Sequence, residues 1–435
     1  MRPSLNYDVV VVGAGVAGLT AGARLAEGGA RVCVLAKGVG STHLAAGTVD
    51  VLGYHPDRVD SPAAAMPAFV AARPDHPYAL LGVDAIAPAL GWFAECIERG
   101  PQVGYRYRGG VERNQLLPTA VGAPRPSALV PETMAAGDLG VDLPVCVVGT
   151  RVLREFHASL CAGNITRLGI EARAVELKLD LDRPEVNALG LARRFDDPAF
   201  RRDFAARLAP LLEGDERVGV PAVLGLRNPH GAWSDLQDRL GRPVFEIPTL
   251  PPSVPGMRMF EALRAALRAA GGRLVMGARV VGAEREGARV TALRVDTAGR
   301  ETVFGARSVV LATGGFASGG LALGSDWAVR ETVLDLPLRG VPPPGSPRFR
   351  AEYFGEQPMA RVGVAVEATL RAEGAENVLV AGAALPGAEP WREGSGEGIS
   401  LTSGHRAAEL VLASDGLAAA ALSGSSGLGP LRTET

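Results

Sequence analysis

The chain has 435 residues, which exceeds the size at which one hydrophobic core stops growing, so two domains are expected. Its formal net charge of −2 argues against a basic surface for nucleic acid or for an anionic membrane. The four cysteines are too widely spaced for a zinc or iron–sulfur motif, and no apolar run reaches the roughly 18 residues of a membrane span. We therefore expect a protein of the reducing cytosol that holds no metal.

The first predicted elements form a strand–turn–helix–strand unit. A valine-rich strand at 8–12 runs into a glycine turn at 13–18, a helix of small residues extends to about Glu27, and a second strand spans 31–35. The spacing G-x-G-x-x-G in this context is typical of a turn that binds a dinucleotide phosphate at a helix N-terminus. It predicts a cofactor site that includes Gly13, Gly15, Val16, Ala17 and Gly18.

The end of the second strand departs from the usual dinucleotide pattern. An acidic residue normally stands there and holds the adenosine ribose, whereas this chain has Ala36 followed by Lys37. The glycine-punctuated segment 37–53 is small and polar enough to wrap closely around a flat ligand. It adds Lys37, Ser41, Thr42, His43, Gly47 and Thr48 to the predicted cofactor site.

The middle of the chain predicts a second, smaller α/β unit. Residues 55–140 are rich in proline and glycine, and the nucleotide-binding pattern lapses there. Periodicity then predicts helices at 88–99, 153–168 and 198–214, and strands at 144–148, 171–179, 218–226 and 243–247. The proline-rich segment 248–256 cannot continue a helix or a central strand, and we interpret it as the connector that returns the chain to the first domain.

The last third resumes the cofactor fold. After a helix at 257–270, strands at 273–276, 279–284, 289–297 and 301–304 form a predicted meander. A buried strand from 306 ends in the turn 312–315, a strand from 377 ends at Gly382, and the turn 394–398 leads into a helix at 399–413. Strand ends and helix N-termini of this kind approach cofactors in two-dinucleotide-fold flavoproteins. They add Thr313, Gly314, Gly382, Gly396 and Gly398 to the predicted site.

From residue 7 to about 413 the chain resembles the B subunits of the anaerobic glycerol-3-phosphate dehydrogenases. The matching stretches are 43–50, 76–82, 146–149, 248–256 and 316–320, and the proline connector and the His-Pro-Tyr segment are the most specific of them. The turn 394–398 departs from the family, which has a run of glycines with a cysteine there. The resemblance implies FMN as the cofactor, and the absence of a carboxylate at Ala36 and Ala383 also favours FMN over FAD.

The resemblance implies a flavoprotein subunit that works with an FAD-dependent catalytic subunit and an iron–sulfur subunit that anchors the complex at the inner face of the membrane. The complex would oxidise sn-glycerol 3-phosphate to dihydroxyacetone phosphate and pass electrons to quinone. Such chemistry needs a base and cationic groups for the substrate phosphate. His43 and His230 are the candidate bases, and Arg227 and Arg258 are the candidate phosphate ligands.

The predicted fold class is α/β, a Rossmann-like two-dinucleotide-fold flavoprotein with an inserted second α/β domain. Residues 1–55, 257–325 and 360–413 are expected to form the flavin-binding domain, 56–256 a substrate or partner domain, and 423–435 a disordered tail. Two alternatives remain open. One is a self-sufficient flavin dehydrogenase of the fumarate-reductase type, and the other is a non-catalytic binding protein with a nucleotide fold.

Overall fold

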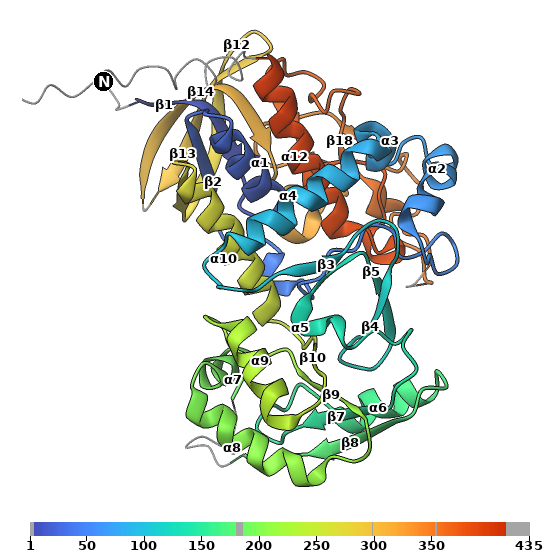
Figure 1. Ribbon diagram of the computed structural model, residues 1–435. Coiled ribbons are helices and arrows are strands. Elements are labelled where there is room, and N and C mark those ends of the chain that lie inside the picture. The colour runs from blue at the N-terminus through green and yellow to red at the C-terminus, as the bar shows by residue number, and fades with distance from the viewer. Residues whose placement is uncertain (1–3, 180–185, 298, 353–354, 415–435) are drawn as a thin grey trace, which may run out of the picture.

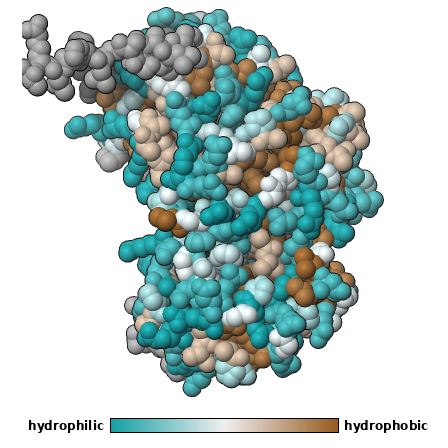
Figure 2. Space-filling model, viewed as in Figure 1, coloured by the Kyte–Doolittle hydropathy of each residue, from teal (hydrophilic) through white to brown (hydrophobic). Residues whose placement is uncertain are grey.

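The computed structural model describes residues 4–179, 186–297, 299–352 and 355–414. The predicted disordered tail at 423–435 lies outside these residues. Two β-sheets with separate hydrophobic cores organise the described chain, in the upper and lower parts of Figure 1. The molecule narrows between the two parts, and the face in view is mostly hydrophilic (Figure 2).

The larger sheet has seven strands in the order β11-β2-β1-β14-β13-β12, and β19 pairs with the end of β14. Strands β11, β2, β1, β14 and β19 are parallel, whereas β12, β13 and β14 form an antiparallel meander. Their bounds are β1 Ser4–Val12, β2 Val32–Ala36, β11 Arg273–Met276, β12 Ala278–Glu286, β13 Arg289–Thr297, β14 Arg300–Leu311 and β19 Val378–Val380. Val9, Val10 and Val11 are fully buried, as a continuous apolar run in a parallel strand covered on both faces requires.

Three long helices pack on this sheet, α1 Val16–Glu27, α10 Val254–Ala269 and α12 Gly396–Ser414, and a fourth, α4 Ile86–Glu98, packs on α10 and α12. Helix α1 contacts both α10 and α12. A Cβ atom at Gly404 of α12 would overlap the carbonyl oxygen of Ala17, so the close approach of α12 to α1 depends on this glycine. The approach brings the start of α12 next to the glycine turn.

Two predicted strands of the large sheet have different partners from those expected. Strand β11 pairs in parallel with β2 and does not belong to the meander, because Gly277, with φ of 73°, turns the chain between β11 and β12. The strands predicted at 301–304 and from 306 are one strand, β14, whose first half pairs with β13 and whose second half pairs with β19. A sequence pattern shows that a strand exists but not which edge it joins.

The smaller sheet has four parallel strands in the order β10-β9-β7-β8. They are β7 Val145–Gly149, β8 Ala172–Glu176, β9 Arg217–Pro221 and β10 Val244–Ile247, and the helices α6 Ala158–Thr166, α7 Ala188–Phe195, α8 Pro198–Leu208 and α9 Pro229–Leu240 connect them. Asn187, Asp197 and Asn228 begin three of these helices, and each side chain accepts a hydrogen bond from a backbone N–H of the first turn. This is the α/β unit expected in the middle of the chain.

The boundary between the two cores does not coincide with residue 56. Helices α2 Pro62–Ala72, α3 Pro77–Leu81 and α4 contribute Phe69, Tyr78 and Phe93 to the core of the larger sheet, and the buried Tyr105 and Tyr107 follow them. The apolar face of α4 packs against α10 and α12, which explains why this part of the predicted middle domain joins the first core. Ala128 and Leu129 also belong to this core, and the core of the smaller sheet begins at Leu139.

Short strands and short α-helices link these larger elements. They are β3 Tyr107–Gly109, β4 Gln115–Pro118, β5 Pro124–Ser127, β6 Leu129–Pro131, α5 Glu132–Ala135, β15 Leu321–Leu323, β16 Val329–Glu331, β17 Leu338–Arg339, β18 Gly363–Val364 and α11 Pro390–Glu393. Among the described helices, none is long and apolar enough to cross a membrane.

Candidate functional site

A cavity of about 1090 Å³ opens where the parallel strands of the larger sheet end. Its wall is built from segments far apart in the sequence: 12–17, 35–45, 278–281, 312–319, 332–333, 382–383 and 390–400 each contribute residues. The carboxyl ends of parallel strands are where α/β proteins of this class bind ligands. Sites for small molecules and cofactors span about 300–1,000 Å³, so this cavity has room for a large nucleotide cofactor.

The glycine turn forms one wall of the cavity. Gly13 has φ of 115°, and a Cβ atom there would overlap the carbonyl oxygen of Ala312, so this position requires glycine. Gly18 lies behind the wall, because its Cβ would overlap the carbonyl oxygen of Gly13. A Cβ at Gly15 would have no described atom within 4 Å, and Gly15 precedes the first turn of α1 without a side-chain cap. The free N–H groups at this helix start are therefore available to a phosphate.

Most of the other predicted cofactor residues also reach the cavity. Those that line it are Gly13, Gly15, Val16, Ala17, Lys37, Ser41, Thr42, Thr313, Gly314, Gly382 and Gly396. Those that do not line it are Gly18, His43, Gly47, Thr48 and Gly398. Gly47 packs on Pro255 and Gly398 packs on Tyr78, and a Cβ at either position would overlap its neighbour. These two glycines therefore support the wall and do not form its surface.

Two hydroxyl groups in the cavity wall are unsatisfied. Oγ1 of Thr42 and Oγ1 of Thr313 are buried, and neither has a hydrogen-bond partner within the described ranges. Buried hydroxyls normally have a partner, because an unpaired one loses its bonds to water without replacement. Both oxygens are sealed off from the cavity space, so they do not face a ligand there. The free N–H groups of α1 and the charge of Lys37 do suit a cofactor with phosphates. The residues present therefore fit a flavin nucleotide.

Glu397 brings a carboxyl group to the cavity from the first turn of α12. Its side chain is 19% exposed, and Oε2 lies 4.0 Å from Nη2 of Arg125. Arg125 itself donates from Nε to Oδ2 of Asp50 at 2.6 Å. Burial, and next the charge of Asp50, raise the pKa of Glu397 to about 7, although Arg125 opposes them. Glu397 therefore changes its charge near neutral pH.

Asp50 is better satisfied than Glu397. Besides Arg125, it accepts hydrogen bonds from the hydroxyls of Ser127 at 2.7 Å and of Thr48 at 2.9 Å. Thr48, which was predicted as a cofactor residue, therefore donates a hydrogen bond to Asp50 and does not line the cavity. From the sequence, only the glycines of the turn 394–398 were expected at the site, although an acidic residue inside a glycine turn at a helix start is itself a usable signal.

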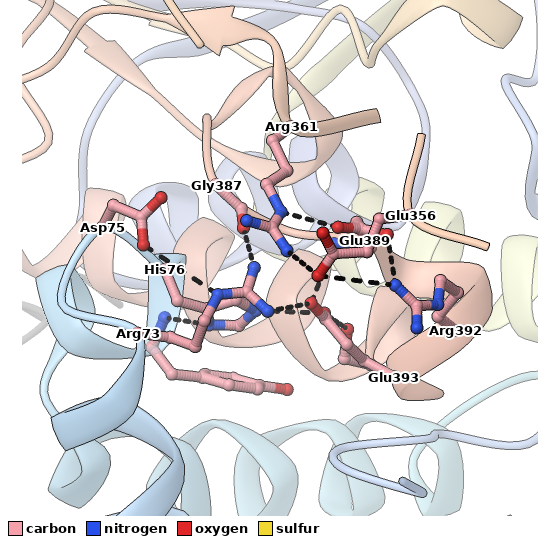
Figure 3. A network of polar contacts seen from close by, with 11 residues as sticks. Arg73, Asp75, His76, Glu356, Arg361, Gly387, Glu389, Arg392 and Glu393 are labelled. Atoms are coloured by element: carbon pink, nitrogen blue, oxygen red, sulfur yellow. Dashed lines mark hydrogen bonds and ion pairs between the residues drawn. The ribbon is translucent and has the colours of Figure 1, made fainter. Parts of the chain in front are cut away.

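A buried network fixes the segment that leads into α12 (Figure 3). Glu393 accepts hydrogen bonds from Nε2 of His76 at 3.1 Å and from Oγ of Ser395 at 2.9 Å, and it pairs with Arg73 at 3.5 Å. Nδ1 of His76 accepts from the N–H of Tyr78, so Nε2 carries the proton. Burial alone would raise the pKa of Glu393, but His76 and its other partners hold it below the usual value.

The same network continues toward residues 356–361. Nε of Arg361 donates to Glu389 at 2.6 Å, and Nη2 of Arg73 donates to the carbonyl oxygen of Gly387 at 2.6 Å. These bonds tie the end of α2 and residues 358–361 to the segment 387–395, which precedes Glu397 by a few residues. The His-Pro-Tyr segment noted in the sequence thus positions α12 and does not itself line the cavity.

The two predicted catalytic histidines lie outside the cavity wall. The ring of His43 meets Phe260 edge-on with centroids 5.1 Å apart, its Nε2 has no partner among the described residues, and burial lowers its pKa. His230 lies 2.6 Å from the buried Glu132 through Nδ1, near the junction of the two cores. Neither contact points to a substrate base.

Arg258 is surrounded by buried groups of the protein, which contradicts its predicted contact with a substrate phosphate. It is fully buried, binds Glu246 at 2.7 and 3.0 Å, and donates to the carbonyl oxygen of Gly225 at 2.6 and 3.0 Å. A buried guanidinium requires such partners, and these leave no open side for a ligand. Arg227 is exposed, and its backbone N–H donates to Asp196. Neither arginine lines the cavity.

Comparison with known proteins places this chain among flavoproteins. A family model described as an FAD binding domain matches residues 8–399. The B subunit of the anaerobic glycerol-3-phosphate dehydrogenase from Pectobacterium atrosepticum is 33% identical over 425 residues, which cover 94% of this chain and 99% of that protein. A protein from Halobacterium salinarum, named as a probable B subunit of the same enzyme, is 32% identical, with 93% and 97% covered.

The chain belongs to the B-subunit family of the anaerobic glycerol-3-phosphate dehydrogenases. It is a flavin-dependent oxidoreductase with an FAD-binding type of fold. Solved structures are more distant: Sdh1 of Mycobacterium smegmatis in complex with UQ1 has a TM-score of 0.43 at 12% identity, covering 95% of this chain and 69% of that one. A 3-ketosteroid dehydrogenase from Rhodococcus jostii has a TM-score of 0.42 at 14% identity, covering 95% and 100%.

Metal ligands are not grouped in the part of the chain that the structure describes: no set of three or more His, Cys, Asp or Glu side chains there is placed to hold an ion. The four cysteines, Cys33, Cys96, Cys146 and Cys161, are free and buried. Burial raises the pKa of each thiol, to about 11 or 12, which keeps them protonated.

Proposed function

We propose that this chain is the flavin-binding B subunit of a respiratory complex that oxidises sn-glycerol 3-phosphate to dihydroxyacetone phosphate and passes the electrons to quinone. The observation that carries the proposal is the similarity to B subunits of this enzyme over nearly the full length of both chains. Relatives that are named as one subunit of an enzyme imply a complex with other subunits. We infer an FAD-dependent catalytic subunit and an iron–sulfur subunit that holds the complex at the inner face of the membrane.

We propose FAD as the cofactor, in place of the FMN expected from the sequence. The matching family model is one for FAD. The cavity also continues past the end of β2, along Lys37 and Gly38, to Arg279 and Val281 of β12, where an adenosine half would need space. The backbone of the turn 13–17 would hold the phosphates, and the flavin would supply hydride or electron transfer. Acid extraction and mass measurement of the bound flavin distinguish FAD from FMN.

We propose that substrate oxidation occurs on the partner subunit and that this chain relays electrons. Alcohol oxidation needs a base beside a clamp of cations for the phosphate. Within the described ranges, the charged side chains of the cavity wall are Lys37, Arg279 and Glu397. The two cations, Lys37 and Arg279, lie on the part of the wall assigned above to the adenosine half of the cofactor, and the two arginines predicted as phosphate ligands lie elsewhere. Glu397 alone does not make a substrate site.

Steady-state assays with glycerol 3-phosphate and an artificial acceptor test this role. We expect turnover per flavin by the co-expressed complex and little or none by the isolated, flavin-loaded chain. Comparable turnover by both would place the chemistry on this chain and favour the self-sufficient dehydrogenase. A complex without turnover on glycerol 3-phosphate, with flavin present in every subunit that should hold it, would contradict the proposed substrate.

A further inference from the structure

We propose that Glu397 is the residue of the cofactor cavity that takes up a proton from solvent when the bound flavin is reduced and releases it when the flavin is reoxidised. The inference rests on the proposed flavin binding in this cavity. It does not depend on whether glycerol 3-phosphate is the electron source.

Glu397 lies on the cavity wall and within reach of solvent. It lies in the first turn of α12 and lines the cavity, whereas the backbone of Gly398 packs on Tyr78 and Ser395 donates to Glu393. Its side chain keeps 19% of its surface exposed, so protons from water can reach the carboxyl group. Glu397 is the acidic residue among the described residues that line the cavity.

The cation beside Glu397 is shared with a second carboxylate. Asp50 and Glu397 share Arg125, but Arg125 lies 2.6 Å from Asp50 and 4.0 Å from Glu397. Three phenols also face this region: Tyr54, Tyr78 of α3, whose hydroxyl donates to the carbonyl oxygen of Val51, and Tyr107 of β3. Burial raises the pKa of all three phenols above the usual value, so they remain neutral. Glu397 is therefore the group in this cluster whose charge can change.

Glu393 and Glu397 lie close together in the sequence but differ in their hydrogen-bond partners. Glu393 is also buried and stands four residues earlier, but it accepts hydrogen bonds from His76, Ser395 and the N–H of Glu389. These bonds stabilise its ionised form, and its pKa is lowered. The cation near Glu397 is Arg125, which binds Asp50 more closely, and the pKa of Glu397 is raised to about 7. The hydrogen bonds of Glu393 favour its ionised form, whereas Glu397, with a more distant cation, can gain or lose a proton near neutral pH.

The proton balance follows from charge repulsion. Reduction brings an electron pair into the cavity, supplied by a secondary alcohol, a reduced flavin of a partner or a chemical reductant. The added negative charge disfavours an ionised carboxylate nearby, so its pKa rises further. One O–H bond then forms at Glu397 with a proton from water, and it breaks again when the electron pair leaves. The affinity for electrons and the affinity for this proton are reciprocally linked.

A redox titration of the flavin-loaded chain across pH 5.5–9 tests the proposal. Wild-type protein should show one extra proton taken up per electron pair above about pH 7, seen as a steeper dependence of midpoint potential on pH. Glu397→Gln should remove this steepening, and Glu397→Asp should restore it at a different pH. Glu98→Gln, at an exposed position of α4, is the matched control and should behave as wild type.

A second readout requires no reduction. The absorption spectrum of the oxidised flavin should shift with a midpoint near pH 7 in wild-type protein and should be insensitive to pH in Glu397→Gln. If the midpoint potential of the wild-type protein shows no steeper pH dependence above about pH 7, the proposal is wrong, whether or not the variants hold flavin. The same steepening in Glu397→Gln would also overturn it. Extra proton uptake in a protein that does not oxidise glycerol 3-phosphate would leave this inference standing and contradict only the proposed substrate.

Discussion

The cofactor cavity and the junction between the two sheets both contain buried charge, but only one of them satisfies it fully. At the junction, the buried Arg258 and Glu246 bind each other twice, and Thr133, Leu224 and Gly225 satisfy their remaining groups. In the cavity, two carboxylates share Arg125, and two threonine hydroxyls have no partner among the described residues. The difference indicates that fully paired charge holds the two cores together, whereas the cavity keeps a partly exposed carboxyl group, Glu397, only loosely paired beside the space for a ligand.

The largest effect is expected at Gly15. Replacement of Gly15 by valine places a side chain in open space at the start of α1, where a phosphate would lie, so flavin binding should be abolished. The fold should change little, because no described atom lies within 4 Å of the new Cβ. Flavin absorbance per mole of protein, with circular dichroism as a fold check, measures both effects.

The matched control for this variant is Gly163→Val. Gly163 lies in a helix of the smaller sheet, and a Cβ there is also free of described neighbours within 4 Å. It should retain its flavin. Full flavin retention in Gly15→Val would show that the phosphate does not approach this turn. The contrast between cavity and junction would then no longer reflect cofactor binding.

The largest change in stability is expected at the junction. Arg258→Met leaves Glu246 buried without its cation, which typically costs about 3–5 kcal/mol of unfolding free energy. Arg264→Met on the same helix removes a partly exposed pair with Glu261 and should cost less than about 1 kcal/mol. Urea unfolding of both variants measures these costs. If Arg258 instead bound a substrate phosphate, its loss would weaken substrate binding by the complex and leave stability nearly unchanged.

The strand–turn–helix–strand unit could be predicted because its signals are local. Gly13 and Gly18 are required by contacts within the turn or with the adjacent strand end, and the valine run of β1 identifies a strand buried on both faces. The predicted helices at 257–270 and 399–413 agree with α10 and α12 to within three residues at each end. The family resemblance, which depends on specific segments along the whole chain, was also confirmed.

What could not be predicted depends on contacts between distant segments. The pairing of β11 with β2, 240 residues earlier, leaves no trace in the sequence of β11. Arg258 has the sequence context of a free cation because its partner Glu246 stands on the far side of the proline connector. Glu397 gives no comparable signal of its raised pKa, because that shift arises in part from Asp50, almost 350 residues away.

A moderate, pH-dependent effect is expected at Glu397. A carboxyl group whose pKa rises from 4.5 to about 7 on folding binds more protons in the folded state between these values. The unfolding free energy should therefore fall as pH rises from about 4.5 to 7, by up to roughly 3 kcal/mol, and Glu397→Gln should not show this part of the loss. Chemical unfolding of the flavin-free protein at pH 5 and pH 8 measures it. Equal pH dependence in wild type and variant would mean that Glu397 is as well satisfied as Glu393.

The smallest effect is expected at His43, which belongs to neither charged region. His43→Ala removes one edge-on ring contact with Phe260, worth about 0.5–1.5 kcal/mol, and also removes a buried nitrogen without a described partner, which offsets part of that loss. The net change in unfolding free energy should stay within about 1 kcal/mol. Because His43 does not line the cavity, the flavin spectrum and potential should be unchanged. A shifted spectrum with unchanged stability would mean that His43 contacts the flavin, as its place in the segment 37–53 predicts. The cavity wall between Thr42 and Leu44 would then have to rearrange when flavin binds.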